Sequence, residues 1–170
     1  MNHEHLKDVY LHMKWADARI WESVLGSATA NTDEYVLDTL MHIHVTQHSF
    51  LNVWLERPFV RWKREKFESP AKQSEWGASF YPEALKYLDS ISDEDLADSA
   101  VLPWAKYFER TLGREAAETT LLDTLHQLTS HSMHHRGQVA RRLRVLEEVP
   151  PLTDYIVWVW MGRPAPEWPS

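Results

Sequence analysis

Apolar side chains recur with the 3.6-residue period of an α-helix over several long stretches of this 170-residue chain, and this pattern most constrains its fold. In the first stretch they end just before Gly26, a residue type that often terminates helices. Because only 5 residues are glycine, few positions interrupt such helices. The pattern predicts long amphipathic helices that pack through their apolar faces. The apolar positions of the first stretch are Leu6, Val9, Tyr10, Met13, Ile20, Trp21 and Val24.

Capping residues and changes in periodicity mark two further helices. Asp33 and the two residues before it are N-cap candidates for a helix that ends near Glu56. Residues 57–77 show no clean period and predict a long, partly basic connection. A third helix is expected over residues 80–91, followed by a turn or a short helical piece at residues 92–95.

The last third of the chain contains another long helix. Thr119 or Thr120 is placed to cap it. Residues 101–112 before it predict an extended excursion or a short hairpin, and residues 154–160 after it form a short apolar segment. The sequence therefore predicts an all-α fold, an up-and-down four-helix bundle with a long second connection and a short C-terminal helical segment, in one domain over residues 1–170. The stripe of the last long helix consists of Leu121, Leu125, Leu128, Ser132, Val139 and Leu143.

Composition excludes several function classes. The chain has 18 Lys and Arg against 25 Asp and Glu, a net charge of −7, which argues against nucleic acid or an acidic membrane surface as a partner. It has no cysteine, so thiolate metal sites and a cysteine nucleophile are excluded. No apolar run is long enough to span a bilayer and no signal peptide is visible, so we expect a cytoplasmic location without membrane partners.

The histidines are the best candidates for chemistry. Two pairs are spaced four residues apart, which places both rings on one face of a helix: His44 with His48, and His131 with His135. Neutral imidazole is the commonest metal ligand in proteins. With ten histidines in the chain, chance alone gives about 0.6 such pairs, so the spacing by itself is a weak signal of a metal site.

Gly137 lies inside an otherwise continuous helical pattern. Glycine in a helix interior costs about 1 kcal/mol relative to alanine. Two interpretations of this residue are open from the sequence: tight packing against another helix, or close approach of a ligand.

Four motifs carry a resemblance to a known family. Tyr10–Asp17 has an aromatic residue followed by Trp-Ala and an acid, and Asp38–Ile43 has leucine, any residue, histidine and an aliphatic residue. His131–Gln138 has a histidine four residues before His-Arg-Gly-Gln, and Pro150–Tyr155 reads Pro-Pro-x-x-Asp-Tyr. In their order and spacing these motifs resemble the DinB/YfiT-like family of metal-dependent helical bundles. Asp17 departs from the asparagine that is usual there.

The resemblance implies a divalent metal ion held by His42, His131 and His135. Gln138, one helical turn from His134 and His135, is a candidate to orient a ligand. Zn²⁺ or Ni²⁺ is favoured as the ion over Mn²⁺ or Fe²⁺. It also implies a homodimer and an enzyme acting on a small molecule, with a low-molecular-weight thiol as a co-substrate in a transfer, isomerisation or hydrolysis. The alternative is a non-catalytic, metal-binding stress-response module.

The helical period and the resemblance disagree about the second helix. On a helical wheel, His44 and His48 lie close to the average direction of the apolar residues, whereas His42 points to nearly the opposite side. The period alone therefore favours His44 and His48 as ligands, and the resemblance favours His42.

Overall fold

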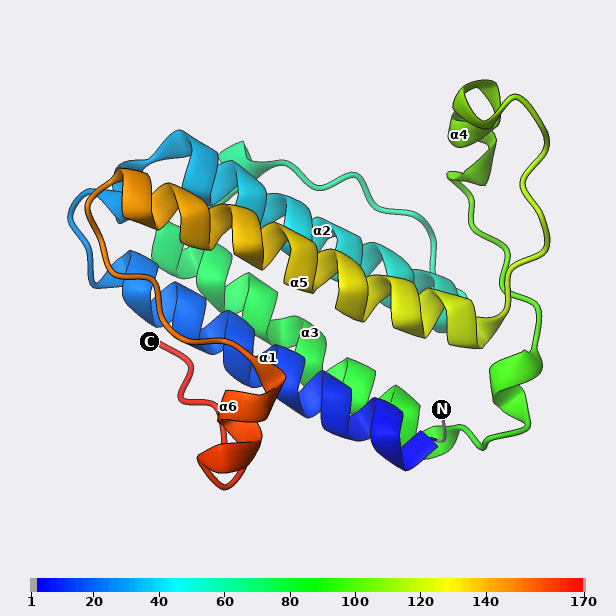
Figure 1. The fold of residues 1–170 in the computed structure, drawn as a ribbon. Coiled ribbons are helices and arrows are strands. Elements are labelled where there is room, and N and C mark those ends of the chain that lie inside the picture. Colours follow the sequence, from blue (N-terminus) through cyan, green and yellow to red (C-terminus); the bar gives the residue numbers. More distant parts are fainter. Residues whose placement is uncertain (1–2, 170) are drawn as a thin grey trace.

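The computed structural model describes residues 3–169, and four long helices form its body (Figure 1). They are α1 (His3–Leu25), α2 (Glu34–Trp54), α3 (Pro70–Ser90) and α5 (Leu121–Val145). The short α4 (Ala105–Leu112) projects from one end of the bundle, and α6 (Tyr155–Trp160) packs against α1 (Figure 1). The prediction of an all-α bundle with a long second connection and a short C-terminal helix is confirmed. Single 3₁₀ turns lie at Ala30–Thr32, Arg64–Lys66 and Asp95–Ala97.

The long second connection, residues 55–69, lets α3 run in the same direction as α2. The predicted up-and-down order is therefore wrong for these two helices, because the connection returns to the end of the bundle where α2 began. At the start of both helices, Gln73 Nε2 donates to the carbonyl oxygen of Leu37 at 2.9 Å. At their ends, the Trp54 ring stacks on Tyr87 with 5.7 Å between centroids. Both α1 and α2 pack against α3 and α5, so α1 and α2 face each other across the bundle. Figure 1 shows the connection returning along the outside of α2 before α3 begins.

Helix α3 begins about ten residues earlier than the sequence predicted, so the connection before it is shorter. The Ser69 side chain accepts a hydrogen bond from the backbone N–H of Lys72 at 3.2 Å, and Pro70 occupies the first turn. Both residues are typical of helix starts. The apolar period is hidden there because the buried residues in the first half of α3 are Gln73, Ser74 and Gly77.

The expected excursion or hairpin at residues 101–112 is instead the helix α4. Pro103 precedes the helix rather than breaking it, and Gly113 ends it with a φ of 68°. The helix buries none of its side chains within the described residues, and Tyr107 is 83% exposed. The helix has only 8 residues, too few for its period to be recognised from the sequence as the periods of the longer helices were.

Two apolar clusters fill the bundle, one towards each end. One contains Tyr10, Trp54 and Phe80, and the other contains Trp21 and Ile43. The predicted stripe of α5 is confirmed, because all six of its residues are buried. Thr120, one of the two residues expected to cap this helix, accepts a hydrogen bond from the backbone N–H of Asp123.

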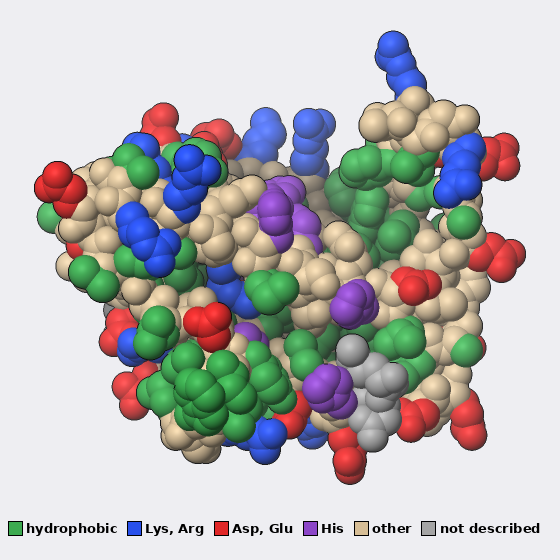
Figure 2. All heavy atoms as spheres, in the orientation of Figure 1, with side chains coloured by type: hydrophobic (Ala, Val, Ile, Leu, Met, Phe, Trp, Pro, Cys, Tyr) green, Lys and Arg blue, Asp and Glu red, His purple; other side chains and the backbone are tan. Residues whose placement is uncertain are grey.

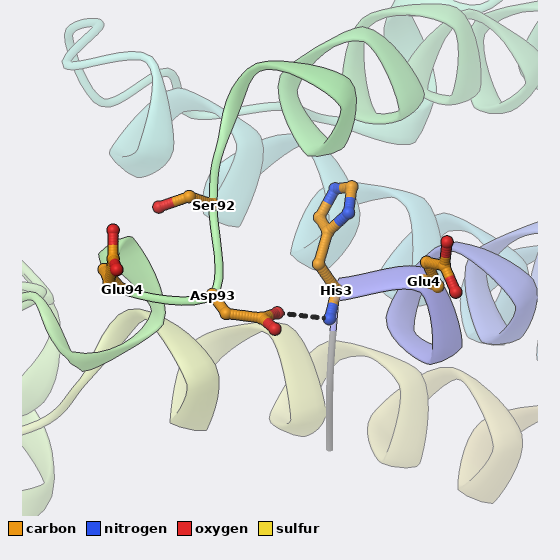
Figure 3. A pocket seen from close by; sticks show the side chains of 5 residues that line it. All are labelled: His3, Glu4, Ser92, Asp93 and Glu94. Carbon is orange, nitrogen blue, oxygen red and sulfur yellow. Dashed lines mark hydrogen bonds between the residues drawn. The ribbon is translucent and has the colours of Figure 1, made fainter.

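The start of α1 is held by the turn that follows α3. The backbone N–H of His3 donates to the Asp93 carboxylate at 2.7 Å (Figure 3). A carboxylate here satisfies a free N–H of the first helical turn and opposes the positive end of the helix dipole. No helix within residues 3–169 is long and apolar enough to cross a membrane.

We predict that Ser69→Ala lowers the free energy of unfolding by about 1 kcal/mol, because it removes the side-chain cap of α3. Urea unfolding followed by circular dichroism measures this. Ser79→Ala, at an exposed position inside the same helix, is the control and is expected to change stability by less than about 0.5 kcal/mol. Equal effects of the two substitutions would contradict the assignment of Ser69 as the cap.

Candidate metal centre

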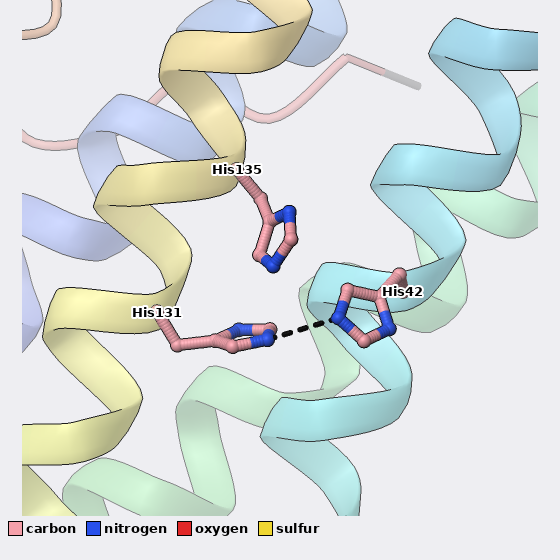
Figure 4. Close-up of side chains that lie close together, drawn as sticks. All are labelled: His42, His131 and His135. Carbon is pink, nitrogen blue, oxygen red and sulfur yellow. Dashed lines mark hydrogen bonds between the residues drawn. The ribbon is translucent and has the colours of Figure 1, made fainter.

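Three histidines converge where α2 meets α5 (Figure 4). His42 comes from α2, and His131 and His135 come from successive turns of α5. One ring nitrogen from each lies within 4.8 Å of the other two, and Nε2 of His131 is 3.0 Å from Nε2 of His42. The structure thus brings together the three residues that the family resemblance selected. They form the one group of three or more side chains with metal-ligating geometry found in residues 3–169.

Contacts at both ends of the α2–α5 pair fix the register that aligns these rings. At the start of α2, Arg142 Nη2 lies 2.6 Å from the Asp33 carboxylate. At its end, Trp54 Nε1 donates to Thr124 Oγ1 at 2.9 Å. Between these contacts the two helices run antiparallel, and the middle of α2 faces the middle of α5. His42 lies at that middle point.

The geometry and chemistry of the three rings fit a divalent ion. A metal–nitrogen bond of about 2.0–2.1 Å places neighbouring ligand nitrogens about 3.0–3.4 Å apart. The Nε2 atoms of His131 and His42 lie 3.0 Å apart, and the ligand nitrogens of all three rings lie within 4.8 Å of one another. Burial lowers the pKa of His42, and it lowers the pKa of His131 to about 4. Both rings are therefore neutral at pH 7, as metal ligation requires.

Gln138 orients His135. Nδ1 of His135 is 2.8 Å from Gln138 Oε1, an acceptor, so this nitrogen carries the proton and Nε2 keeps its lone pair. The amide of Gln138 donates in turn to Nε2 of His134 at 3.0 Å. Metal-ligating histidines commonly donate their second N–H to such an acceptor. The sequence-based choice of Gln138 as an orienting residue agrees with this contact.

The three-histidine cluster is open to solvent. His42 is exposed, and His131 and His135 are half-buried. Figure 2 shows histidine side chains gathered at the molecular surface over α5. No carboxylate joins the group within the described residues.

A buried polar network lies directly beneath the cluster. Asp17 and Arg136 are 2% and 4% exposed, and Arg136 Nη1 donates to Asp17 Oδ1 at 2.8 Å. The second carboxylate oxygen accepts from the Tyr81 hydroxyl and from Gln47 Nε2, the latter at 2.8 Å. Gln47 also donates to Ser132 Oγ at 3.3 Å. The network joins all four long helices at the level of the histidines, since Ser132 and Arg136 each follow a cluster histidine in sequence.

The charge of Asp17 balances the buried guanidinium of Arg136. A buried guanidinium needs an opposite charge nearby, because desolvation makes an isolated ion very unfavourable. The sequence contained a signal for this network that we did not use. Asp17 falls four residues after Met13 and four before Trp21 in the apolar stripe of α1, which predicts a buried carboxylate.

His44 and His48 belong to the core and not to the cluster. His44 accepts from Trp21 Nε1 at 2.7 Å, and its other ring nitrogen lies 2.7 Å from the acceptor oxygen of Gln47. His48 stacks on Trp76 with 4.5 Å between ring centroids and donates to the Trp76 carbonyl oxygen at 3.1 Å. The helical period correctly placed both rings towards the core, but its choice of them as ligands is not supported, because neither joins His131 and His135.

Comparison with known proteins agrees with this geometry. A family model described as the DinB superfamily matches residues 36–139. This span covers more than half of the chain and includes His42, His131 and His135. A search of curated proteins gave no match.

We predict that Asp17→Ala lowers the free energy of unfolding by about 3–5 kcal/mol, because it leaves the Arg136 guanidinium buried without a counter-charge. Asp8→Ala is the matched control, since Asp8 pairs with Arg163 at 3.3 Å on the surface and should contribute less than about 1 kcal/mol. Urea unfolding of both variants measures the difference. Similar losses of unfolding free energy in the two variants would show that the buried ion pair contributes no more to stability than the surface pair.

We also predict a pH dependence that comes from His48. Burial lowers the pKa of His48 to about 4, below its ordinary value of 6.5, so the folded state binds fewer protons than the unfolded state between these values. The stability that this neutral ring contributes is complete above pH 6.5 and is lost as the pH falls towards 4, by up to about 1.4 kcal/mol per pH unit.

Replacing His48 with a residue that does not titrate should remove its contribution to the pH dependence of the unfolding free energy. In metal-free protein, His48→Gln should make the curve of unfolding free energy against pH less steep between 6.5 and 4, while the part of the slope that comes from His131 and the other buried histidines remains. Glutamine keeps a donor for the Trp76 carbonyl but does not titrate. Parallel curves for the wild type and the variant would show that His48 does not contribute to the acid sensitivity.

Proposed function

Because the chain belongs to the DinB superfamily, we propose that it is a divalent-metal enzyme whose ion is held by His42, His131 and His135. The observation that carries this proposal is the convergence of three imidazoles from two helices at an open surface. Bound there, Zn²⁺ or Ni²⁺, or else Mn²⁺ or Fe²⁺, acts as a Lewis acid that lowers the pKa of a coordinated water or thiol.

The side chains around this site have distinct roles in preparing it for a metal ion. His42 and His131 supply neutral rings, and Gln138 holds the proton of His135 on Nδ1 so that Nε2 faces the cluster. The Asp17–Arg136 pair fixes the turn of α5 that carries His135. These contacts keep the donor atoms in place before an ion arrives, which reduces the entropy lost on binding.

The openness of the site favours an enzyme over a structural metal site. Structural zinc sites are closed by four protein ligands, whereas catalytic sites have three and keep a position for water or substrate. Within residues 3–169 the cluster has three ligand side chains and no fourth. His42 is also exposed, so a small molecule has direct access. These features support catalysis over the alternative of a non-catalytic, metal-binding stress-response module.

We propose a small molecule as the substrate and a low-molecular-weight thiol as the co-substrate, with the enzyme acting as a transferase, isomerase or hydrolase in the cytoplasm. The thiol follows from the resemblance in four motifs. The net charge of −7 argues against nucleic acid as a partner. A screen of metal-loaded protein with thiols and electrophilic small molecules tests the reaction: titration of the remaining thiol detects transfer, and analysis of the products detects isomerisation or hydrolysis. Equal thiol consumption by the His131→Ala/His135→Ala variant would overturn it.

Each of His42→Ala, His131→Ala and His135→Ala is expected to lose most bound metal while the protein stays folded, because each removes one of three ligands at the surface. Metal analysis of protein prepared without a histidine tag, together with circular dichroism, measures both quantities. His126→Ala, at an exposed position of α5 outside the cluster, should retain the metal of the wild type. Full metal occupancy in the His131→Ala/His135→Ala variant would refute the proposed site.

We further propose that the protein is a homodimer. Large apolar side chains gather around α6, where Trp160 is 77%, Met161 58% and Ile156 48% exposed. Exposed apolar patches of this kind often mark interfaces between subunits. Light scattering at tens of micromolar chain concentration is expected to give the mass of a dimer. A monomer mass under these conditions would refute the dimer.

A further inference from the structure

The structure removes one of the two interpretations of Gly137. A Cβ atom added to Gly137 would meet nothing within 4 Å from the rest of the described chain. Gly77 shows the opposite situation, because a Cβ there would lie 2.5 Å from Nε2 of His44. Tight packing within the chain therefore accounts for Gly77 but not for Gly137. The missing side chain at residue 137 instead leaves open space.

That open space is part of a cavity between α1 and α5. The cavity has a volume of about 500 Å³ and is closed at one side by residues 153–155. Figure 2 shows this face of the molecule, with apolar and histidine side chains around the depression between the two helices. Pockets that bind small molecules have volumes of about 300–1,000 Å³. Its apolar lining comes from Leu6, Val9, Met13, Met133, Ala140 and Tyr155.

Two buried polar side chains also line the cavity. Arg136 is 4% exposed, and its Nη1 is engaged by Asp17, but a guanidinium has five N–H donors. His12 is 7% exposed, and its Nε2 donates to the Thr153 carbonyl oxygen at 2.9 Å. Because Asp17 already balances the charge of Arg136, the cavity offers hydrogen-bond donors without a free positive charge. An uncharged oxygen acceptor suits it better than an anion.

We infer that the α1–α5 cavity is a binding site for a small, uncharged molecule with an apolar body and a carbonyl oxygen. The apolar body occupies the space over Gly137, and the carbonyl oxygen accepts from the Arg136 guanidinium. Gly137 is exposed in the middle of the 25-residue α5 and lines the cavity, so its missing side chain leaves room there for a ligand.

The cavity is separate from the three-histidine cluster. Successive residues of a helix are rotated by about 100°, so Gly137 points about 200° away from His135. His131 and His135 face α2, whereas Gly137 and Met133 face α1. Ligand binding in the cavity therefore does not depend on the metal and is tested in its absence.

The experiment uses prodan, an uncharged naphthalene ketone whose emission shifts to the blue in an apolar environment. It is titrated into the full chain in the presence of a chelator, and binding of one molecule per chain is expected. Gly137→Leu, which fills the cavity and improves helix propensity, should weaken binding at least about tenfold. Ala140→Leu fills the same cavity one turn later and provides a second variant with the same expected result.

Two controls separate the cavity from other apolar surface. Gly137→Ala adds one methyl group to open space and should keep the affinity within about threefold of the wild type. Trp160→Ser removes exposed apolar surface from α6 and should also leave binding unchanged. Unchanged binding in both leucine variants, or loss in Trp160→Ser alone, would overturn the inference. Dissociation of a dimer by Gly137→Leu would also overturn the inference, because it would show that a second copy of the chain covers the cavity.

Discussion

The buried ion pair between Asp17 and Arg136 is the interaction on which the rest of this structure depends. Two opposite charges persist inside a helical bundle only when hydrogen bonds from several elements satisfy them together. Here Gln47 from α2 and Tyr81 from α3 complete the set around a pair made by α1 and α5. Apolar packing tolerates some sliding and rotation of helices, whereas this directional network accepts one arrangement. The positions of the surface histidines follow from that arrangement.

The residues of helix α5 lie in three different environments, because the 3.6-residue helical period places them on three different faces. One face carries the buried stripe from Leu121 to Leu143, the next presents His131 and His135 to α2, and the third borders the cavity beside α1 with Gly137. Arg136 lies between the last two faces and is anchored from within by Asp17. The metal cluster and the cavity are thus independent surfaces of one rigid element, each shaped by residues that leave the core stripe intact.

Much of the bundle could be predicted because its helices bury long apolar stripes, as α1, α2 and α5 do. The first half of α3 was missed because it packs through Gln73, Ser74 and Gly77, which carry no apolar period. Helix α4 was missed because its 8 residues are too few to tell a helical period from an extended segment. At the site, the period alone placed His44 and His48 inward and could not select His42, since a surface ligand lies off the core-facing stripe by necessity. Motif resemblance supplied that residue, and the register of α2 against α5 explains it.

The return of the second connection along the bundle has a consequence for how the chain folds. Since α1 and α2 pack mainly against α3 and α5, and touch each other through few core contacts such as Trp21 with His44, these two helices cannot bury their full stripes against each other. Their contacts join residues such as Tyr10 and Leu125, more than a hundred positions apart. High sequence separation slows folding, because chain closure precedes the gain from packing. During synthesis the apolar faces of the first two helices are therefore covered only in part by α3 until α5 leaves the ribosome, which exposes the nascent chain to aggregation.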